Sequence, residues 1–309
     1  MWLVIAVVIL FILLLLVAWY FFRRVFRRPP TKDLLKEEVL MSSELFSFAS
    51  ILKPALIWFQ KQNWEKLSVT AEDGTELKAL WLNGKQDKPC MLLMHGYGAL
   101  PQNLSPIARW ASQKGWAVLL PYARSHGESG GDTCSLGLLE SEDCRRWASL
   151  AAEKTGAGLI LYGAGMGAFT ALLAMEKPLP ESVLAVVSDG TYSSPREILR
   201  HVMRRQLGMR VFPMLQLVCL YGLLKWKRSL GADLKPVLEA ARTPVLFIHG
   251  KQDRQVPVSM TEELYKAYAG KKELYVAENA GHGAACLSDT GEYFQRLDRF
   301  LKPLLAAKK

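Results

Sequence analysis

Paired cysteines are missing from this sequence. It has five cysteines in 309 residues, an odd number, and none of them forms a Cys-x-x-Cys pair. The spacing therefore indicates neither a disulfide framework nor a zinc site. We expect most of the five to be small buried residues, which agrees with a reducing compartment.

Charged side chains are missing from the first 22 residues. The run from Met1 to Phe22 is long enough to cross a bilayer as a helix, its last four residues are aromatic, and four arginines follow within residues 23–28. A cleaved signal peptide would instead have a basic start, a shorter apolar run and a small-residue cleavage site. We predict that residues 1–22 are an uncleaved, single-pass membrane anchor. The positive-inside rule then places the main domain in the cytoplasm.

Acidic residues are scarce in a second basic segment. The net charge is +10, and part of it lies between residues 196 and 228, where eight basic residues stand against Glu197 alone. Because the arginines alternate with apolar residues at helical spacing, in a chain with a membrane anchor, anionic lipid headgroups explain the pattern better than nucleic acid does. An ordinary solvated helix face explains it equally well. We expect no nucleic-acid partner.

Internal repeats and low-complexity segments are also missing, and strand-like and helix-like segments alternate instead. Segments 67–71 and 77–82 flank a turn and predict a hairpin, whereas segment 90–94 is a continuous apolar run typical of a strand buried on both faces. The alternation predicts an α/β fold, with a mostly parallel sheet flanked by helices. The predicted parts are a transmembrane anchor (1–22), a basic juxtamembrane segment and connecting helix (23–63, amphipathic and helical over 32–62), a core (64–190 and 241–309) and a helical lid over the carboxyl end of the sheet (191–240).

A nucleophile is missing from the most informative motif of the chain. Residues 159–168 predict a short apolar strand, a tight glycine turn and a helix, which is the layout of a G-x-S-x-G nucleophile elbow. Gly165 stands where that motif has serine, and neither Ala164 nor Met166 beside it carries a hydroxyl or thiol. The strained dihedrals of an elbow cost a residue with a side chain about 1–3 kcal/mol, so glycine relieves strain there.

Four motifs in the same order resemble those of the α/β-hydrolases, especially their esterase, lipase and serine-aminopeptidase-like members. The resemblance covers roughly residues 64 to 305. It implies an α/β-hydrolase fold with a helical lid insertion, preceded here by one N-terminal transmembrane helix. The motifs are His95-Gly96-Tyr97-Gly98, the loop Arg124-Ser125-His126-Gly127-Glu128-Ser129, the elbow at Gly165, and residues 244–257 with Gly281-His282-Gly283 after one more strand.

The resemblance also implies a role for each candidate site residue. His282 would be the general base and Asp253 its carboxylate partner, although Asp253 could instead be a turn residue that holds its own backbone. The backbone N–H groups of Tyr97 and Met166 would form the oxyanion hole. The histidines of the first two motifs are expected to shape loops rather than to transfer protons.

A dinucleotide-binding interpretation competes for the same glycines. Gly163, Gly165 and Ala168 fit the fingerprint G-x-G-x-x-G/A, and Asp189 lies at the next strand end, 26 residues after Gly163. However, the fingerprint normally opens its domain at the first strand, whereas several predicted strands precede it here. It would also leave the two downstream motifs without a role, so the hydrolase resemblance is favoured.

Three functions remain open at this point. The first is a hydrolase-family protein with negligible turnover that binds a small acyl-type ligand, because loss of the nucleophile costs a serine hydrolase about a millionfold in turnover. The second is an active hydrolase of carboxylic esters or amides in which His282 activates water directly. The third is a membrane-docking or partner-binding protein that uses the basic lid. None of the three implies a cofactor or a metal.

Overall fold

The computed structural model describes residues 1–306, and its centre is one eight-stranded sheet. The last three residues of the predicted core segment 241–309 lie outside this description. The strands are β1 (Glu65–Thr70), β2 (Glu76–Leu82), β3 (Cys90–Met94), β4 (Ala117–Pro121), β5 (Leu159–Ala164), β6 (Val183–Asp189), β7 (Val245–Gly250) and β8 (Lys272–Ala277).

The strand order is β1-β2-β4-β3-β5-β6-β7-β8. β1 and β2 form the predicted antiparallel hairpin, β2 is also antiparallel to β4, and every other neighbouring pair is parallel. The prediction of a mostly parallel sheet is therefore confirmed. β3, β4 and β7 are buried along their whole length, because parallel strands with helices on both faces have no solvent side.

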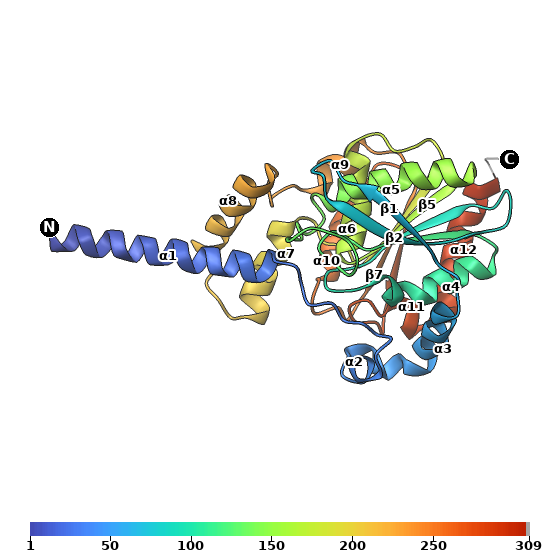
Figure 1. Ribbon diagram of the computed structural model, residues 1–309, viewed down its shortest axis with the longest axis horizontal. Helices are drawn as coiled ribbons and strands as arrows, with labels where there is room; N and C mark the ends of the chain where they lie inside the picture. The colour runs from blue at the N-terminus through green and yellow to red at the C-terminus, as the bar shows by residue number, and fades with distance from the viewer. Residues whose placement is uncertain (307–309) are drawn as a thin grey trace.

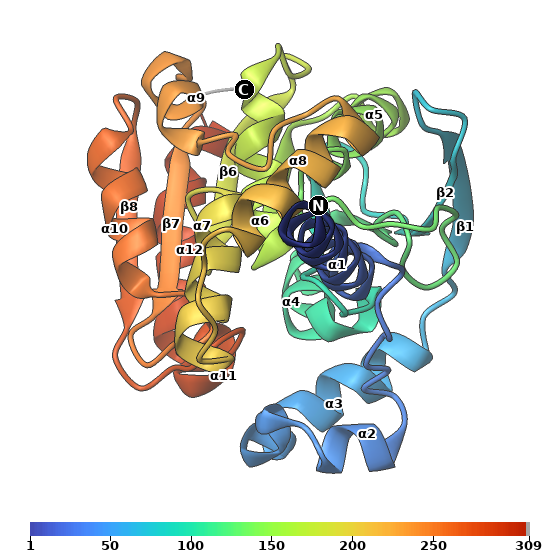
Figure 2. The same cartoon turned by 90° about the vertical axis from the view of Figure 1, so that its left-hand side faces the viewer.

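Helices cover both faces of the sheet (Figures 1 and 2). Along β3, Leu92 packs in the same cluster as Trp147, and Leu93 packs in the same cluster as Phe300 on the opposite face. The α-helices are α1 (Trp2–Phe26), α2 (Glu37–Met41), α3 (Ala49–Gln60), α4 (Ser105–Gln113), α5 (Glu140–Thr155), α6 (Met166–Leu173), α7 (Pro195–His201), α8 (Met214–Trp226), α9 (Leu234–Ala240), α10 (Val258–Ala267), α11 (Ala285–Ser288) and α12 (Thr290–Ala306). The other helical elements are the 3-10 helices η1 (Glu44–Phe48), η2 (Pro101–Leu104) and η3 (Ala174–Glu176), and the π-helical turn η4 (Val202–Gln206). Helices α5, α6, α9 and α10 belong to the first face, and α3, α4, α11 and α12 belong to the second.

The predicted helical insertion lies between β6 and β7 and contains α7, η4, α8 and α9. It starts at the carboxyl end of β6, where the hydroxyl of Ser194 caps α7 by accepting the N–H of Glu197 (3.2 Å). Its helix α8 lies beside α1 in both views (Figures 1 and 2). The hydroxyl of Tyr221 on α8 donates to the carbonyl of Leu15 on α1 (3.0 Å). The insertion therefore adjoins the N-terminal helix as well as the sheet.

Helix α1 is the one helix within residues 1–306 that is long and apolar enough to cross a membrane. Its 25 residues span about 37 Å. Its first half projects away from the rest of the protein (Figure 1), whereas Ala18, Phe22 and Phe26 near its end are buried. The rings of Phe22 and Phe26 pack on Trp226 of α8, with centroids 5.4 and 5.0 Å away. The helix thus continues four residues beyond the apolar run, because its last turn has its own contacts with α8.

The connecting helix predicted over residues 32–62 is divided into three helical pieces, α2, η1 and α3. The carboxylate of Asp33 accepts the N–H of Leu35 (3.1 Å), which makes a turn where the helix was expected to begin. At the end of α2, the hydroxyls of Ser42 and Ser43 bond back to backbone carbonyls. Short polar side chains that bond locally compete with the helix, and the apolar spacing of the segment does not reveal this competition.

Candidate active site

A single residue, Gly165, connects β5 to α6. Its φ is +56° and its ψ is −114°. Its N–H donates to the carbonyl of Asp189 at the end of β6 (2.8 Å), and its own carbonyl accepts the N–H of Ala168 (3.0 Å). These bonds hold a sharp bend whose positive φ strongly favours glycine. The strand, turn and helix expected for residues 159–168 are all present.

The three glycines of this bend are there for different reasons. A Cβ on Gly163 would collide with the backbone of Gly167, and a Cβ on Gly167 would collide with the carbonyl of Met94, so neither position has room for a side chain. A Cβ on Gly165 would meet no atom closer than 3.4 Å, and that nearest atom is Nε2 of His282. The space at residue 165 therefore admits a side chain directly in front of an imidazole.

His282 and Asp253 meet from two loops, one after β8 and one after β7. Nδ1 of His282 lies 2.7 Å from Oδ2 of Asp253 and donates its hydrogen to it. Oδ1 of Asp253 accepts the N–H groups of Gln255 and Val256 (both 2.8 Å). The carboxylate thus has both of the roles left open by the sequence, since one oxygen holds its own turn and the other orients the imidazole. Nε2 of His282 is left facing residue 165.

Both members of this pair have shifted pKa values. Burial alone would raise the pKa of Asp253, but hydrogen bonds from His249 and His282 outweigh burial and hold that pKa well below its usual range. Burial alone would lower the pKa of His282, but the hydrogen bond and charge of Asp253 outweigh it, so the pKa is raised. The pair therefore stabilises the carboxylate and the imidazolium together.

We expect the imidazole of His282 to titrate above pH 6.5, the usual value for histidine. Because this pKa is raised by folding, its contribution to stability is fully present below pH 6.5 and is lost as the pH rises through the folded pKa. Asp253→Asn removes the charge that outweighs burial and should move the midpoint below that of the wild-type protein. NMR titration of the His282 Cε1–H signal, assigned with His282→Ala, measures both midpoints. A wild-type midpoint at or below 6.5 would contradict the geometry.

Two buried histidines shape the loop that follows β3. Nε2 of His95 accepts the N–H of Ala123 (3.0 Å), so its Nδ1 donates to the carbonyl of Gly96 (2.9 Å). Nε2 of His126 accepts the N–H of Gly98 (3.0 Å). Burial and the neighbouring His126 lower the pKa of His95 to about 3. His95 therefore stays neutral at physiological pH, and its two ring nitrogens hold backbone.

The backbone N–H groups of Tyr97 and Met166 come to the bend from different elements. Met166 is the first residue of α6, so its N–H has no acceptor within the helix. The Cα of Gly96 would lie 3.9 Å from a Cβ at Gly165, which places the loop containing Tyr97 next to the bend. An oxyanion hole requires both N–H groups to converge on one point, so this role stays a prediction for Tyr97 and Met166.

The chain after α1 is bonded to the loop that contains the second motif. Arg27 forms an isolated β-bridge with Thr133. The guanidinium of Arg28 donates to the carbonyls of Ser129 (3.0 Å) and Gly127. The arginines of residues 23–28, which the sequence predicts to be the basic flank of a membrane anchor, therefore also hold this loop. A cluster of basic residues in the sequence does not by itself indicate this second contact.

The same segment contacts the loop after β3. The hydroxyl of Tyr97 donates to the carbonyl of Val25 at the end of α1 (2.7 Å), and the N–H of Lys32 donates to the carbonyl of Gly98 (2.9 Å). We call residues 25–32 the strap. It joins the membrane-length helix to the loop of the second motif and to the loop after β3, and the latter borders the bend at residue 165.

Asp189 lies beneath the bend and is largely buried. Its Oδ2 accepts the hydroxyls of Tyr162 (3.1 Å) and Tyr293 (2.8 Å), and burial raises its pKa. The dinucleotide interpretation requires this carboxylate to face a ribose, and it requires the glycine fingerprint to follow the first strand. Here the carboxylate bonds two core tyrosines, and the fingerprint follows β5.

His249 is a further buried residue of the site that the sequence did not single out. Its Nε2 lies 3.4 Å from Oδ2 of Asp253, and its Nδ1 lies 2.7 Å from the hydroxyl of Thr261. The residue stands inside the quoted segment 244–257, but a motif position gives no indication of a second imidazole against the carboxylate. All five cysteines are free, and within residues 1–306 no group of three His, Cys, Asp or Glu side chains could hold a metal ion.

No family model matches the chain. It is similar to two uncharacterised bacterial proteins over most of their length. It is 29% identical to YqkD of Bacillus subtilis over 276 residues, which cover 87% of this chain and 86% of that protein. It is 24% identical to YfhR of Escherichia coli K12 over 251 residues, which cover 78% of this chain and 81% of that protein.

Solved structures with a similar fold include esterases and lipases. An esterase of Pyrococcus furiosus aligns with a TM-score of 0.64 and 20% identity, over 78% of this chain and 92% of its own. A putative lipase of Acinetobacter baumannii aligns with a TM-score of 0.61 and 19% identity, over 84% and 97%. A membrane phospholipase A described as a bacterial virulence factor aligns with a TM-score of 0.58 and 20% identity, over 84% and 91%. At these identities the likeness concerns architecture, and residues 64–306 have the α/β-hydrolase fold.

Proposed function

We propose that this chain is a member of the α/β-hydrolase superfamily in which glycine replaces the elbow serine, so that it binds a small acyl-type ligand with negligible serine-hydrolase turnover. The observation that carries this proposal is the position of Gly165, where a Cβ would lie 3.4 Å from Nε2 of His282. A serine nucleophile lies about 2.6–3.2 Å from its general base, a distance that a hydroxyl on that Cβ can reach. The chain has the general base and its carboxylate partner, but residue 165 provides no oxygen atom that could attack a substrate.

The remaining groups suit an acyl ligand. The N–H groups of Tyr97 and Met166 would bind its carbonyl oxygen, and such backbone donors are unaffected by the loss of a side chain at Gly165. Asp253 would keep His282 oriented toward the ligand. Binding by these groups persists without the nucleophile, whereas attack on the carbonyl carbon does not.

One observation favours a second function, hydrolysis of carboxylic esters or amides by a water that His282 activates. Nδ1 of His282 is held by Asp253, and Nε2 faces the space that a side chain at Gly165 would fill. A water in that space could lose a proton to Nε2 as it attacks a bound carbonyl. The third candidate, docking of a membrane or a protein partner through the basic insertion, is supported by the exposed Arg204 and Arg205.

The assay of the native protein separates the first two functions. We expect wild-type protein to hydrolyse short and long p-nitrophenyl esters no faster than His282→Ala does, because nothing at Gly165 attacks the carbonyl. Release of p-nitrophenol measures the rate, and quenching of protein fluorescence by a non-hydrolysable long-chain ketone measures binding. Turnover near the ordinary enzymatic median of about 10 per second, abolished by His282→Ala, would establish the water-activating hydrolase instead.

We further propose that α1 anchors the protein in a membrane with its main domain in the cytoplasm. An 18-residue stretch of the helix has a mean hydropathy of 3.2, and the arginines of residues 23–28 follow the apolar part of the helix on the side of the domain. We expect the full chain to stay in the membrane pellet after alkaline carbonate extraction. Protease added outside sealed, right-side-out vesicles should leave the domain intact. Release by carbonate would refute the membrane anchor, and degradation from outside would show the opposite orientation.

A further inference from the structure

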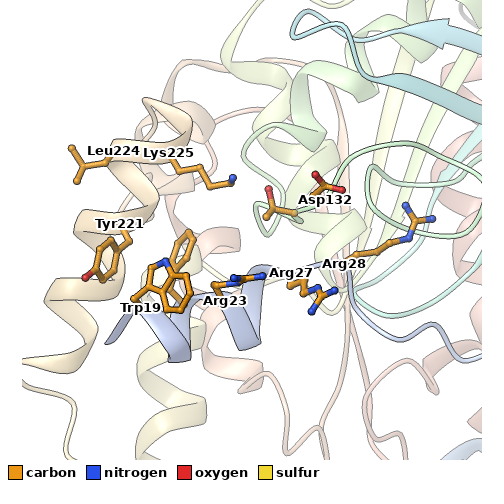
Figure 3. A pocket seen from close by; sticks show the side chains of 10 residues that line it. Trp19, Arg23, Arg27, Arg28, Asp132, Tyr221, Leu224 and Lys225 are labelled. Atoms are coloured by element: carbon orange, nitrogen blue, oxygen red, sulfur yellow. The ribbon is translucent and has the colours of Figure 1, made fainter. Parts of the chain in front are cut away.

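The end of α1 and the insertion helix α8 enclose a cleft of about 720 Å³ that contains none of the elbow residues (Figure 3). Its walls include the aromatic rings of Trp19, Phe22 and Tyr221. Four basic side chains line it, and the carboxylate of Asp132 is the one acidic group among its lining residues. The cleft is therefore aromatic on one side and positively charged overall.

Three of the four basic side chains are available to a ligand. Arg23 extends from the last turn of α1, Arg27 directly follows α1, and Lys225 extends from α8 on the opposite side (Figure 3). None of the salt bridges within residues 1–306 uses these three groups, and the guanidinium of Arg23 lies over the ring of Trp19, 4.9 Å from its centroid. The fourth basic side chain, that of Arg28, already donates to the carbonyls of Ser129 and Gly127. Three cations without a salt-bridge partner, on the two sides of one cleft, favour a ligand with a phosphate group.

An apolar trough adjoins the charged cleft. It has a volume of about 360 Å³, is lined by Ile12, Leu15 and Leu16, and shares Trp19 and Tyr221 with the cleft. It runs along α1 toward the N-terminus, away from the arginines. A charged cleft joined to a hydrocarbon-lined trough fits an amphiphile that has an anionic head and an acyl chain.

We propose that this site binds one anionic glycerophospholipid, with its phosphate against Arg23, Arg27 and Lys225 and one acyl chain in the trough. The inference rests on the proposed membrane anchoring, because α1 then places the aromatic and arginine level at the headgroups and the trough within the hydrocarbon. A zwitterionic lipid adds a cationic choline to the same cluster, so a net negative headgroup is preferred.

Native mass spectrometry of the full chain in neutral detergent tests the site. We expect phosphatidylglycerol to bind with one-to-one stoichiometry and at least about tenfold more tightly than phosphatidylcholine. Arg23→Gln/Lys225→Gln should weaken phosphatidylglycerol binding by about tenfold or more, since each basic group near an anionic lipid contributes about fivefold. Leu16→Trp, which narrows the trough without changing charge, should weaken it several-fold.

The matched control is Arg299→Gln/Lys302→Gln, which also removes one arginine and one lysine, from exposed positions of α12 outside the cleft. It should leave phosphatidylglycerol binding within about twofold of wild type. Equal losses in the two double variants would show a diffuse basic surface and overturn the discrete site. Full competition by millimolar inorganic phosphate, with no effect of Leu16→Trp, would overturn the choice of a lipid. If the chain resists carbonate extraction but binds both lipids equally, the lipid site is refuted and the anchoring proposal stands. If carbonate releases the chain, the anchoring proposal itself is refuted.

Discussion

Gly165→Ser should be labelled covalently by a fluorophosphonate probe, whereas the wild-type protein should not. The substitution puts a hydroxyl on a Cβ that lies 3.4 Å from Nε2 of His282, within reach of a general base already oriented by Asp253. Hydrolysis of p-nitrophenyl esters should rise by at least about a thousandfold, toward the roughly millionfold that removal of a serine nucleophile costs. In-gel fluorescence and p-nitrophenol release measure the two effects.

Two variants isolate the added oxygen. Gly165→Ala adds the same Cβ at the same φ of +56°, so it should lose the same stability as Gly165→Ser, about 1–3 kcal/mol, and gain no labelling. Gly165→Ser/His282→Ala has the hydroxyl without its base and should also remain unlabelled. The rate of Gly165→Ser should rise with pH through the raised pKa of His282, because the base must be neutral to accept a proton. A folded Gly165→Ser that reacts with neither probe nor ester would show that the bend does not aim at a substrate.

Arg124→Ala should lower the free energy of unfolding by about 3–5 kcal/mol. The guanidinium makes two bonds of 2.7 Å to Asp143 and a third of 2.7 Å to Asp73. The side chains of Arg124 and Asp143 are 6% and 4% exposed, so removing the cation leaves a carboxylate buried without a partner. Urea denaturation in neutral detergent, followed by tryptophan fluorescence, measures the loss.

Two further measurements separate burial from charge. Arg124→Met/Asp143→Leu removes both charges and should recover most of the lost stability, because apolar side chains of similar volume can replace a buried ion pair. Lys66→Ala breaks a pair with Glu128 whose side chains are 66% and 43% exposed, and it should change stability by less than about 1 kcal/mol. Similar losses for Lys66→Ala and Arg124→Ala would refute the assignment of the effect to burial.

The central strands of the sheet could be predicted from the sequence because they are short apolar runs with turn residues at their ends. Segment 90–94, for example, is apolar throughout and is buried at every position as β3. The bend at Gly165 could also be predicted from the sequence, because small residues at positions 163 and 167 are needed wherever a helix packs this closely on the preceding strand. In both places the cause lies within a few residues along the chain.

What the sequence did not reveal depends on contacts between distant segments. The bond from the hydroxyl of Tyr97 to Val25 joins residues 72 positions apart, and the bond from Arg28 to Ser129 joins residues 101 apart. The second imidazole against the carboxylate, that of His249, becomes visible only when the loop after β7 is folded. No pattern of apolar or charged residues encodes such pairings, because either partner alone is an ordinary tyrosine, arginine or histidine.

A fragment of this protein without the N-terminal helix would differ from the whole chain at the candidate site. A fragment that begins after residue 32 lacks the carbonyl that fixes the Tyr97 hydroxyl and the guanidinium that ties down residues 127–129. Its elbow would be intact, but the loops after β3 and β4 would have lost their hydrogen bonds to residues 25–32. Affinities measured on such a fragment would therefore describe site loops that are held less firmly than in the chain with residues 1–32.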